Sequence, residues 1–224
     1  MTNRSCYIAG FLKDNIKKGP KRVLDISCGD GDLLNILTQA YRSKEVYGLD
    51  INSGGLAKGI LRGNFDKAIP IRGDAYHLTE KNPKFDIVYL GKDDSVKFRE
   101  LNEPLRNFDL VTSVNPANML SHEEALKIRN EGLVKTRRFI PPKVISIPAK
   151  QKGHVLYETE IAHQGSWFSG GRTPNEITED YVNDNLERIL KEGEEGGLKH
   201  VSHQLIESDG LQRSVDLAVL FKKL

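Results

Sequence analysis

Cysteine and long apolar runs are both scarce in this chain of 224 residues. Cys6 and Cys28 are its only cysteines, which is too few for a disulfide framework and fits a reducing compartment. The apolar runs span only a handful of residues each, so no segment predicts a membrane span. The first ten residues lack the uninterrupted apolar core of a signal peptide. We therefore expect a cytoplasmic protein with no membrane partner.

An excess of one charge is also missing. The chain has 33 basic and 31 acidic residues, a net charge of +2, and its basic residues are scattered along the sequence. Nucleic-acid-binding proteins usually concentrate basic residues in a stripe, and the nearest candidates, residues 135–138 and 222–223, are short. The 38% of hydrophobic and 29% of charged residues are typical of a folded domain. The composition weakly favours a small or neutral substrate.

Strand-like and helix-like segments alternate through the first third of the chain. Strands are expected at 22–26, 45–49 and 68–72, and helices at 7–17, 33–41 and from 56 to 61. This order predicts parallel strands joined by crossover helices, hence a doubly wound α/β sheet. Ligands of such sheets bind beyond the carboxyl ends of the strands. Asp25, Asp50 and Asp74 all fall at or just beyond those ends.

The fourth parallel strand has two candidates of similar composition, residues 85–90 and 108–114. We favour the second, because a helical stretch at 123–134 follows it. The first would then pair with 95–101, as a hairpin inserted over about 84–105.

A fifth strand is expected at 141–147, with further extended chain at 153–161. Residues 173–176, Thr-Pro-Asn-Glu, have the sequence of a helix start, with a capping threonine, a proline in the first position and a returning glutamate. That helix should end by the Gly- and Glu-rich segment 192–197.

The last two strands, at 199–207 and 214–221, flank the turn at 208–210 and predict an antiparallel hairpin. His200 and His203 should point to opposite faces of the first of these strands. No histidines or cysteines have metal-ligand spacing, so the sequence predicts no metal site.

A glycine-rich turn joins the first strand to its helix. Gly29 and Gly31 let the backbone approach a ligand where a Cβ would clash, and an acid such as Asp50, at the end of the second strand, can accept both ribose hydroxyl protons. The G-x-G-x-x-G spacing of dinucleotide sites is missing. Asp30 and Asp32 would repel phosphates and tolerate a sulfonium and an ammonium. An NAD-dependent oxidoreductase is therefore disfavoured.

Taken singly, these features have simpler explanations. The two glycines fit any tight strand-to-helix turn, Asp50 fits a helix cap, and Asp74 fits a turn former. Their ordered recurrence at three successive strand ends is what indicates a ligand.

In these residues the chain resembles the class I, Rossmann-like S-adenosylmethionine (SAM)-dependent methyltransferases. The matching stretches are 23–31, 46–50, 72–75, 108–114 and 215–222. The resemblance is clear over 20–115 and holds only in outline beyond. It implies a single domain, residues 1–224, with a mostly parallel seven-stranded sheet whose final strand is reversed near the edge. A SAM-binding half would span about 20–115 and an acceptor-side half about 115–224.

The resemblance also implies SAM as the cofactor and S-adenosylhomocysteine as its product. By position, Asp25 with Gly29 and Gly31 would line the methionine portion, Asp50 would hold the ribose hydroxyls, and Asp74 with Ala75 would meet the adenine. The implied cofactor-binding set is completed by Ser27, where the family usually has glycine, and by Cys28, Ile51 and Asn115.

Two segments are candidates for the acceptor side. Residues 115–118, Asn-Pro-Ala-Asn, are reminiscent of the Asn/Asp-Pro-Pro-aromatic signature of amino-group methyltransferases, from which Ala117 and Asn118 depart. In that signature Asn115 would orient a planar amine; a plain strand-to-helix turn is the alternative.

The segment 160–172 holds the only tryptophan, together with His163 and an arginine, where family members commonly wall the acceptor pocket. A hydrophobic plug under a loop is the alternative. We take His163 as the first candidate for a general base, with Tyr157 and His122 behind it.

We therefore expect a SAM-dependent methyltransferase, a monomer or homodimer, that transfers the methyl group in line to a small-molecule acceptor. Two alternatives stay open. One is N-methylation of a nucleobase or a protein amine through the turn at 115–118, in which a nucleic acid or a protein is the partner. The other is a SAM-binding sensor or subunit without transferase activity.

Overall fold

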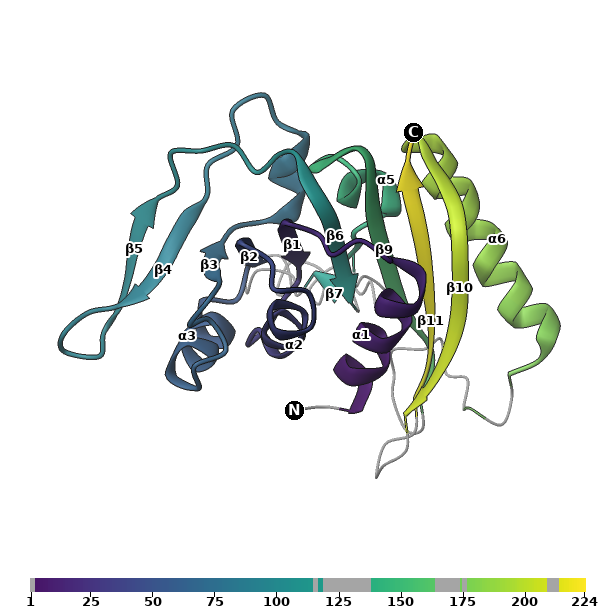
Figure 1. The fold of residues 1–224 in the computed structure, drawn as a ribbon, viewed down its shortest axis with the longest axis horizontal. Coiled ribbons are helices and arrows are strands. Elements are labelled where there is room, and N and C mark those ends of the chain that lie inside the picture. The colour runs from purple at the N-terminus through teal and green to yellow at the C-terminus, as the bar shows by residue number, and fades with distance from the viewer. Residues whose placement is uncertain (1–2, 115–116, 119–137, 164–173, 175–176, 209–213) are drawn as a thin grey trace, which may run out of the picture.

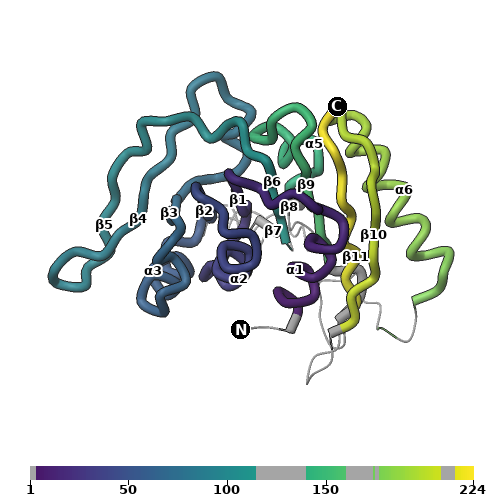
Figure 2. The backbone as a smooth tube through the Cα atoms, viewed as in Figure 1, coloured from purple at the N-terminus to yellow at the C-terminus, as the bar shows by residue number. Residues whose placement is uncertain are grey.

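The computed structural model describes residues 3–114, 117–118, 138–163, 174, 177–208 and 214–224. Within them, nine strands form one sheet in the order β10-β11-β9-β6-β1-β2-β3-β4-β5 (Figure 1). A separate two-stranded sheet pairs β7 (Ala117–Asn118) with β8 (Arg138–Phe139), which Figure 2 labels beside each other.

The centre of the large sheet is parallel. β1 (Arg22–Ile26) lies between β2 (Glu45–Asp50) and β6 (Phe108–Val114), and β3 (Ile69–Arg72) and β9 (Ala149–His163) extend the parallel array on either side. Because β6 pairs directly with β1, 108–114 is confirmed as the fourth parallel strand.

Antiparallel pairs flank this centre. β11 (Ser214–Lys223) runs antiparallel to both β9 and β10 (Leu198–Ser208), so the reversed final strand lies one place from the edge, as expected. At the other end, β4 (Asp86–Leu90) pairs with β3 and with β5 (Val96–Glu100), which confirms the hairpin. The hairpin adds two strands to the seven that the family implies.

Helices cover both faces of the sheet. α1 (Asn3–Asn15), α2 (Asp32–Tyr41) and α3 (Ser53–Leu61) lie side by side on one face (Figure 1), and α5 (Pro142–Ile145) and α6 (Glu179–Glu195) lie on the other. Successive strand residues face alternate layers. Val23 packs in the core cluster under α1–α3, whereas Leu24 packs in the cluster under α5 and α6.

The expected fifth strand at 141–147 is wrong. Residues 142–145 form the short helix α5, with a proline at its first position, and the fifth parallel strand begins only at Ala149. Two adjacent prolines explain the difference: neither has an N–H for a sheet ladder, and the second suits the first turn of a helix. The extended chain foreseen at 153–161 is part of the actual strand.

α6 begins at Glu179 and ends at Glu195, within the Gly- and Glu-rich segment where its end is expected. Of the helix start expected at 173–176, only Pro174 lies within the described residues. Its cap is Thr178, whose side chain accepts a hydrogen bond from the backbone N–H of Tyr181. Glu179 and Asp180 then fill the first turn, where acids favour the helix dipole. The helix passes through Glu195 before it ends at a glycine. The helix expected at 123–134 lies outside the described residues.

The prediction that His200 and His203 point to opposite faces is wrong. The pairing of β10 with β11 shifts register between His200 and Ser202, which marks a bulge. A bulge inserts one residue and changes the alternation of faces, so the two rings meet, with Nδ1 of His203 3.3 Å from Nε2 of His200. In the described part of the chain, no three His, Cys, Asp or Glu side chains are grouped to hold a metal ion.

Candidate functional site

Parallel pairing gathers the strand ends that the sequence singled out. Asp25 is in register with Gly48 of β2, and Asp50 is in register with Arg72 of β3. The carboxyl ends of β1, β2 and β3 therefore form one edge of the sheet, which we call the carboxyl edge. None of the helices that the structure describes is long and apolar enough to cross a membrane.

The turn after β1 has an uncommon backbone. Ser27, Gly29 and Gly31 all have positive φ, at 63°, 57° and 78°. The turn is tied to β2, because the N–H groups of Ser27 and Cys28 both donate to the carbonyl of Leu49, at 2.8 and 3.2 Å. Ser27, where the family usually has glycine, therefore adopts a left-handed backbone conformation that glycine adopts without strain. For serine this conformation costs roughly 1 kcal/mol.

The two glycines of the turn have different roles. A Cβ placed on Gly31 would lie 2.8 Å from the ring of Phe65, so this glycine permits packing. Among the residues that the structure describes, a Cβ placed on Gly29 would meet nothing within 4 Å. Gly29 thus borders open space, with its backbone accessible to a ligand.

Asp50 links the end of β2 to this turn. Its Oδ2 accepts a hydrogen bond from the backbone N–H of Gly29 at 2.8 Å, and its Oδ1 accepts one from the N–H of Asn52 at 2.8 Å. Burial raises the pKa of Asp50, and these backbone donors oppose the rise. The helix cap is Asn52 instead, whose Oδ1 accepts from Gly54 and Gly55, so Asp50 is placed for another role.

Asp25 lies deeper, with only 2% of its surface exposed. The hydroxyl of Thr112 on β6 donates to its Oδ1 at 2.7 Å. Burial raises the pKa of Asp25 to about 7, the Thr112 hydrogen bond opposes the rise, and the negative charge of Asp50 adds to it. Two carboxyl groups at one edge make this end of the sheet a place for a positive charge.

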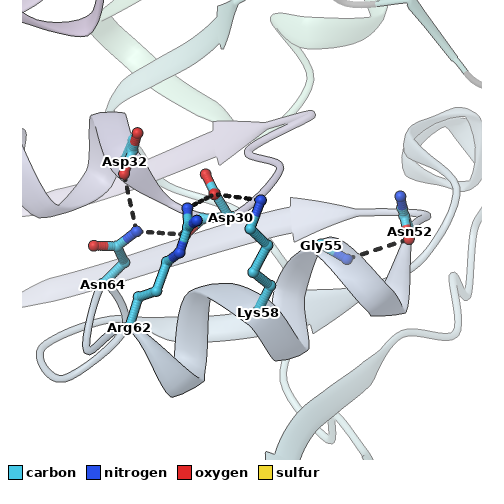
Figure 3. A network of polar contacts seen from close by, with 7 residues as sticks. All are labelled: Asp30, Asp32, Asn52, Gly55, Lys58, Arg62 and Asn64. Carbon is cyan, nitrogen blue, oxygen red and sulfur yellow. Dashed lines mark hydrogen bonds and ion pairs between the residues drawn. The ribbon is translucent and has the colours of Figure 1, made fainter. Parts of the chain in front are cut away.

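A polar network fastens α3 and the segment after it to the turn (Figure 3). The carboxylate of Asp30 pairs with Arg62 at 2.8 Å and with Lys58 at 3.8 Å. The amide of Asn64 donates to the carbonyl of Asp30 at 2.9 Å and to the carboxylate of Asp32 at 3.0 Å. Asp30 and Asp32 have partners of their own within the protein, so their charges alone do not disfavour a pyrophosphate. The missing glycine spacing does disfavour it.

Sequence reasoning missed this network. Lys58 and Arg62 are four residues apart, a spacing that places two side chains on one helix face, and that signal could have indicated an acidic partner. Gly59 lies between them on the same side, where a Cβ would come within 2.2 Å of the carbonyl oxygen of Asp30. The glycine allows the helix to approach the turn closely.

Asp74 follows β3 and caps the short 3₁₀ helix η1 (Ala75–Thr79) by accepting from the N–H of Tyr76 at 2.9 Å. Ala75 is buried. Gly73 donates its N–H to the carbonyl of Asp50 at 3.0 Å, which joins the second and third strand ends. The turn-forming role of Asp74 is thus present, and its contact with an adenine stays a prediction.

The acceptor-side candidates are less well defined. Tyr157 on β9 is buried in the core cluster under α5 and α6, where burial raises the pKa of its hydroxyl well above the ordinary value. His163 is the last residue of β9 and pairs with Ser214. Asn115 and His122 lie outside the described residues, as do residues 164–173. The roles assigned to all four stay predictions.

Comparison with known proteins agrees with the geometry over part of the chain. Residues 23–93 match the model of the methyltransferase domain family. Phthiotriol/phenolphthiotriol dimycocerosates methyltransferase 1 of Mycobacterium ulcerans (strain Agy99) is 34% identical over 74 residues, which are 33% of this chain and 27% of that protein. Demethylmenaquinone methyltransferase of Lactobacillus johnsonii is 41% identical over 86 residues, 36% of this chain and 35% of that protein. The matches thus span about a third or less of these relatives.

The fold is shared over a greater length. N-methyltransferase NodS from Bradyrhizobium japonicum WM9, solved in complex with S-adenosyl-L-homocysteine, superposes with a TM-score of 0.55 and 11% identity. That superposition covers 99% of this chain and 88% of NodS. The chain therefore has the fold of the class I SAM-dependent methyltransferases, and its residues 23–93 match the methyltransferase domain family.

Proposed function

We propose that this chain is a SAM-dependent methyltransferase that acts on a small-molecule acceptor. The observation that carries the proposal is the carboxyl edge, where the carboxylate of Asp50 is bonded to the N–H of Gly29 beside open space. The match of residues 23–93 to the methyltransferase domain family supports it. The free thiols of Cys6 and Cys28 and the balanced charge fit a cytoplasmic enzyme, monomeric or homodimeric, with a metabolite as substrate.

The residues present fit SAM, which supplies an electrophilic methyl group on a sulfonium sulfur. Asp50 can accept the ribose hydroxyl protons, because a carboxylate has about four acceptor positions and its backbone bonds fix its orientation. Gly29 offers a surface that a side chain would block. Asp74 and Ala75 stand at the third strand end, where an adenine would lie.

Charge at the carboxyl edge suits the same ligand. Asp25 and Asp50 are carboxyl groups whose pKa values burial raises, so each gains from a nearby positive charge. A methyl donor that carries a sulfonium and an ammonium supplies that positive charge. A pyrophosphate would instead bring more negative charge to the carboxyl edge.

For the transfer itself, the chain has to align the acceptor and exclude water. Alignment of reacting groups can lower the barrier by several kcal/mol, roughly 7–11 at most. A base is needed only if the acceptor loses a proton, and His163 and Tyr157 are the candidates, with Asn115 to orient the acceptor. These acceptor-side roles belong to the proposal.

The cofactor part is tested by calorimetric titration of SAM and S-adenosylhomocysteine into the wild type, Asp50→Asn and the control Asp93→Asn. Asparagine keeps the size of Asp50 and loses its charge, and Asp93 lies in the exposed turn of the β4–β5 hairpin. Loss of charged hydrogen bonds, about 1.5–3 kcal/mol each, should weaken binding at least tenfold in Asp50→Asn and leave the control unchanged. No saturable binding by the wild type would refute the proposal.

The acceptor part needs a transfer assay. Wild type is incubated with methyl-labelled SAM and panels of small amines and phenols, nucleosides, and peptides. Transfer to a small molecule is the expected result. Transfer confined to nucleosides or peptides would contradict the small-molecule acceptor, and tight cofactor binding without transfer to any panel would favour a sensor.

A further inference from the structure

A cavity of about 270 Å³ opens at the opposite edge of the sheet, where the turn before β1 meets the beginnings of β6 and β9. We call it the amino-edge pocket. β1 is five residues long, and a strand rises about 3.3 Å per residue, so roughly 15 Å of sheet separates this pocket from the carboxyl edge. β6 runs from this end of the sheet toward the carboxyl edge, as its arrow shows (Figure 1).

Lysines dominate the lining of the pocket. Lys18 and Lys21 come from the turn before β1, and Lys150 and Lys152 come from the beginning of β9. Of the described residues that line the cavity, Asp109 of β6 is the one acid. The four ammonium groups therefore exceed the carboxylates by three positive charges.

Asp109 is already engaged within the protein. Its Oδ2 accepts the backbone N–H groups of Lys21 and Arg22 at 2.8 and 2.9 Å, and its Oδ1 pairs with the ammonium of Lys150. Burial opposes its ionisation, but these donors together hold the pKa of Asp109 below its ordinary value. The carboxylate is therefore compensated and does not repel an incoming anion.

The remaining lysines have no such compensation. Within the described residues, neither Lys18 nor Lys21 nor Lys152 forms an ion pair. His154, half-buried in the lining, adds no charge at neutral pH, because burial and the nearby Lys222 lower its pKa. Several like charges around one hollow repel each other and focus a positive potential into it, which a bound anion would relieve.

The fold assembles this cluster from distant segments. Parallel pairing sets Phe108 opposite Ala149, so the lysines that follow Ala149 come beside those that precede β1. The basic residues look scattered in the sequence for this reason, and they gather only in the folded sheet.

We propose that the amino-edge pocket binds a small anion that carries two or more phosphate groups. Lysine is a point-charge ligand for phosphate, and three excess positive charges match a diphosphate better than a monoanion. The volume lies just below the range of about 300–1,000 Å³ for small-molecule sites, which suits a compact anion. The phosphates of free pyrophosphate and of a phosphate ester offer the same chemistry.

The test is calorimetric titration of pyrophosphate at fixed ionic strength, without SAM. The site variant is Lys18→Gln with Lys152→Gln. The matched control is Lys191→Gln with Lys199→Gln, which removes the same two charges from exposed positions on α6 and β10. We expect the site variant to bind at least tenfold more weakly than the wild type and the control to bind within twofold of it.

Two outcomes would overturn the proposal. One is no saturable binding of pyrophosphate by the wild type at millimolar concentration. The other is equal weakening in both double variants, which would mean attraction to net charge only. Titration of ADP under the same conditions separates the sources: tighter binding than pyrophosphate assigns the pocket to a phosphate ester, and weaker binding assigns it to the free anion. S-adenosylhomocysteine binding, measured separately on each variant, keeps this result distinct from the proposed methyl transfer.

Discussion

Asp25 is a carboxyl group in a place that disfavours its charge. It is 2% exposed, and its direct neighbour in the site, Thr112, supplies one hydrogen bond. Burial raises its pKa from an ordinary value of 3.8 to about 7. The folded protein therefore binds this proton more tightly than the unfolded chain does. Stability from this source is fully present below pH 3.8 and is lost as the pH rises to about 7.

Asp25→Asn should remove this pH dependence. A shift of one unit corresponds to about 1.36 kcal/mol, so the wild type should lose roughly 2–3 kcal/mol more than the variant between pH 5 and pH 8. Asparagine can still accept the Thr112 hydrogen bond. Urea denaturation of both proteins at the two pH values measures the difference, in which the titration of groups that do not interact with Asp25 cancels. Identical pH dependence would show that Asp25 does not titrate as described.

Individual site residues could be predicted where the chain supplies a local reason for them. Asp25 and Asp50 follow from strand ends in the sequence, and Gly29 follows from the need for a turn. The partners of these residues could not be predicted, because Thr112 reaches Asp25 only through the pairing of β1 with β6. The conformation of Ser27 was also beyond reach, since the sequence indicates the residue's size and not its backbone angles.

At the scale of elements, α1 is joined to the sheet through charge as well as apolar packing. The guanidinium of Arg4 donates to Glu158 on β9 and, at 3.0 Å, to Asp216 on β11. Both carboxylates are fully buried. Their charges are tolerable in the interior only with a cation beside them. One side chain near the start of α1 thus joins the helix to two neighbouring strands.

Arg4→Ala should destabilise the protein by about 3 kcal/mol or more, the loss seen when one partner of a buried ion pair is removed. Lys13→Ala is the control, because Lys13 is an exposed residue of the same helix and should change stability by less than about 0.5 kcal/mol. Chemical denaturation monitored by circular dichroism compares them. Adding Glu158→Gln and Asp216→Asn to Arg4→Ala should restore part of the loss. Equal effects of the two single variants would contradict the account.

The elements of the first half were predictable because strand, turn and helix each have a strong local signal. The elements of the second half were harder to predict. Residues 141–147 have the apolar content of a strand. A strand also needs backbone N–H groups to pair with its neighbours, and the two prolines have none. The bulge at His200 has no local signal, because it arises from the register with β11. Features set by pairing between distant segments are the ones that the sequence could not reveal.

For the whole molecule, one parallel array separates two kinds of chemistry. Strands that run in the same direction put Asp25 and Asp50 at one edge and Lys21 and Lys150 at the other. The chain is nearly neutral in total, and the fold brings two carboxyl groups together at the carboxyl edge and four lysines together at the amino-edge pocket. Net charge alone weakly favours a small or neutral substrate, and it gives no sign of the lysines that the fold gathers around the amino-edge pocket.

The same sheet predicts a gradient of local stability. β1 and β6 lie at its centre, buried on both faces and paired on both sides. Within the described sheet, β5 is an edge strand that pairs with β4 alone, and all five of its residues are exposed. Amide protection follows burial and local contacts. Amides of β5 should therefore exchange about a hundredfold faster than those of β1 and β6, or more, in hydrogen–deuterium exchange followed by mass spectrometry.

β10 provides the internal control, because it is also an edge strand. It pairs with β11 along almost its whole length, and β11 is buried over residues 215–221. Its amides should exchange at rates between those of β5 and the central strands. Slow exchange in β5 would contradict this order and would mean that another surface covers the edge where Val96 and Phe98 are exposed. Repeating the measurement on diluted protein identifies that surface, since protection by a second copy of the chain falls with concentration and protection within one chain does not.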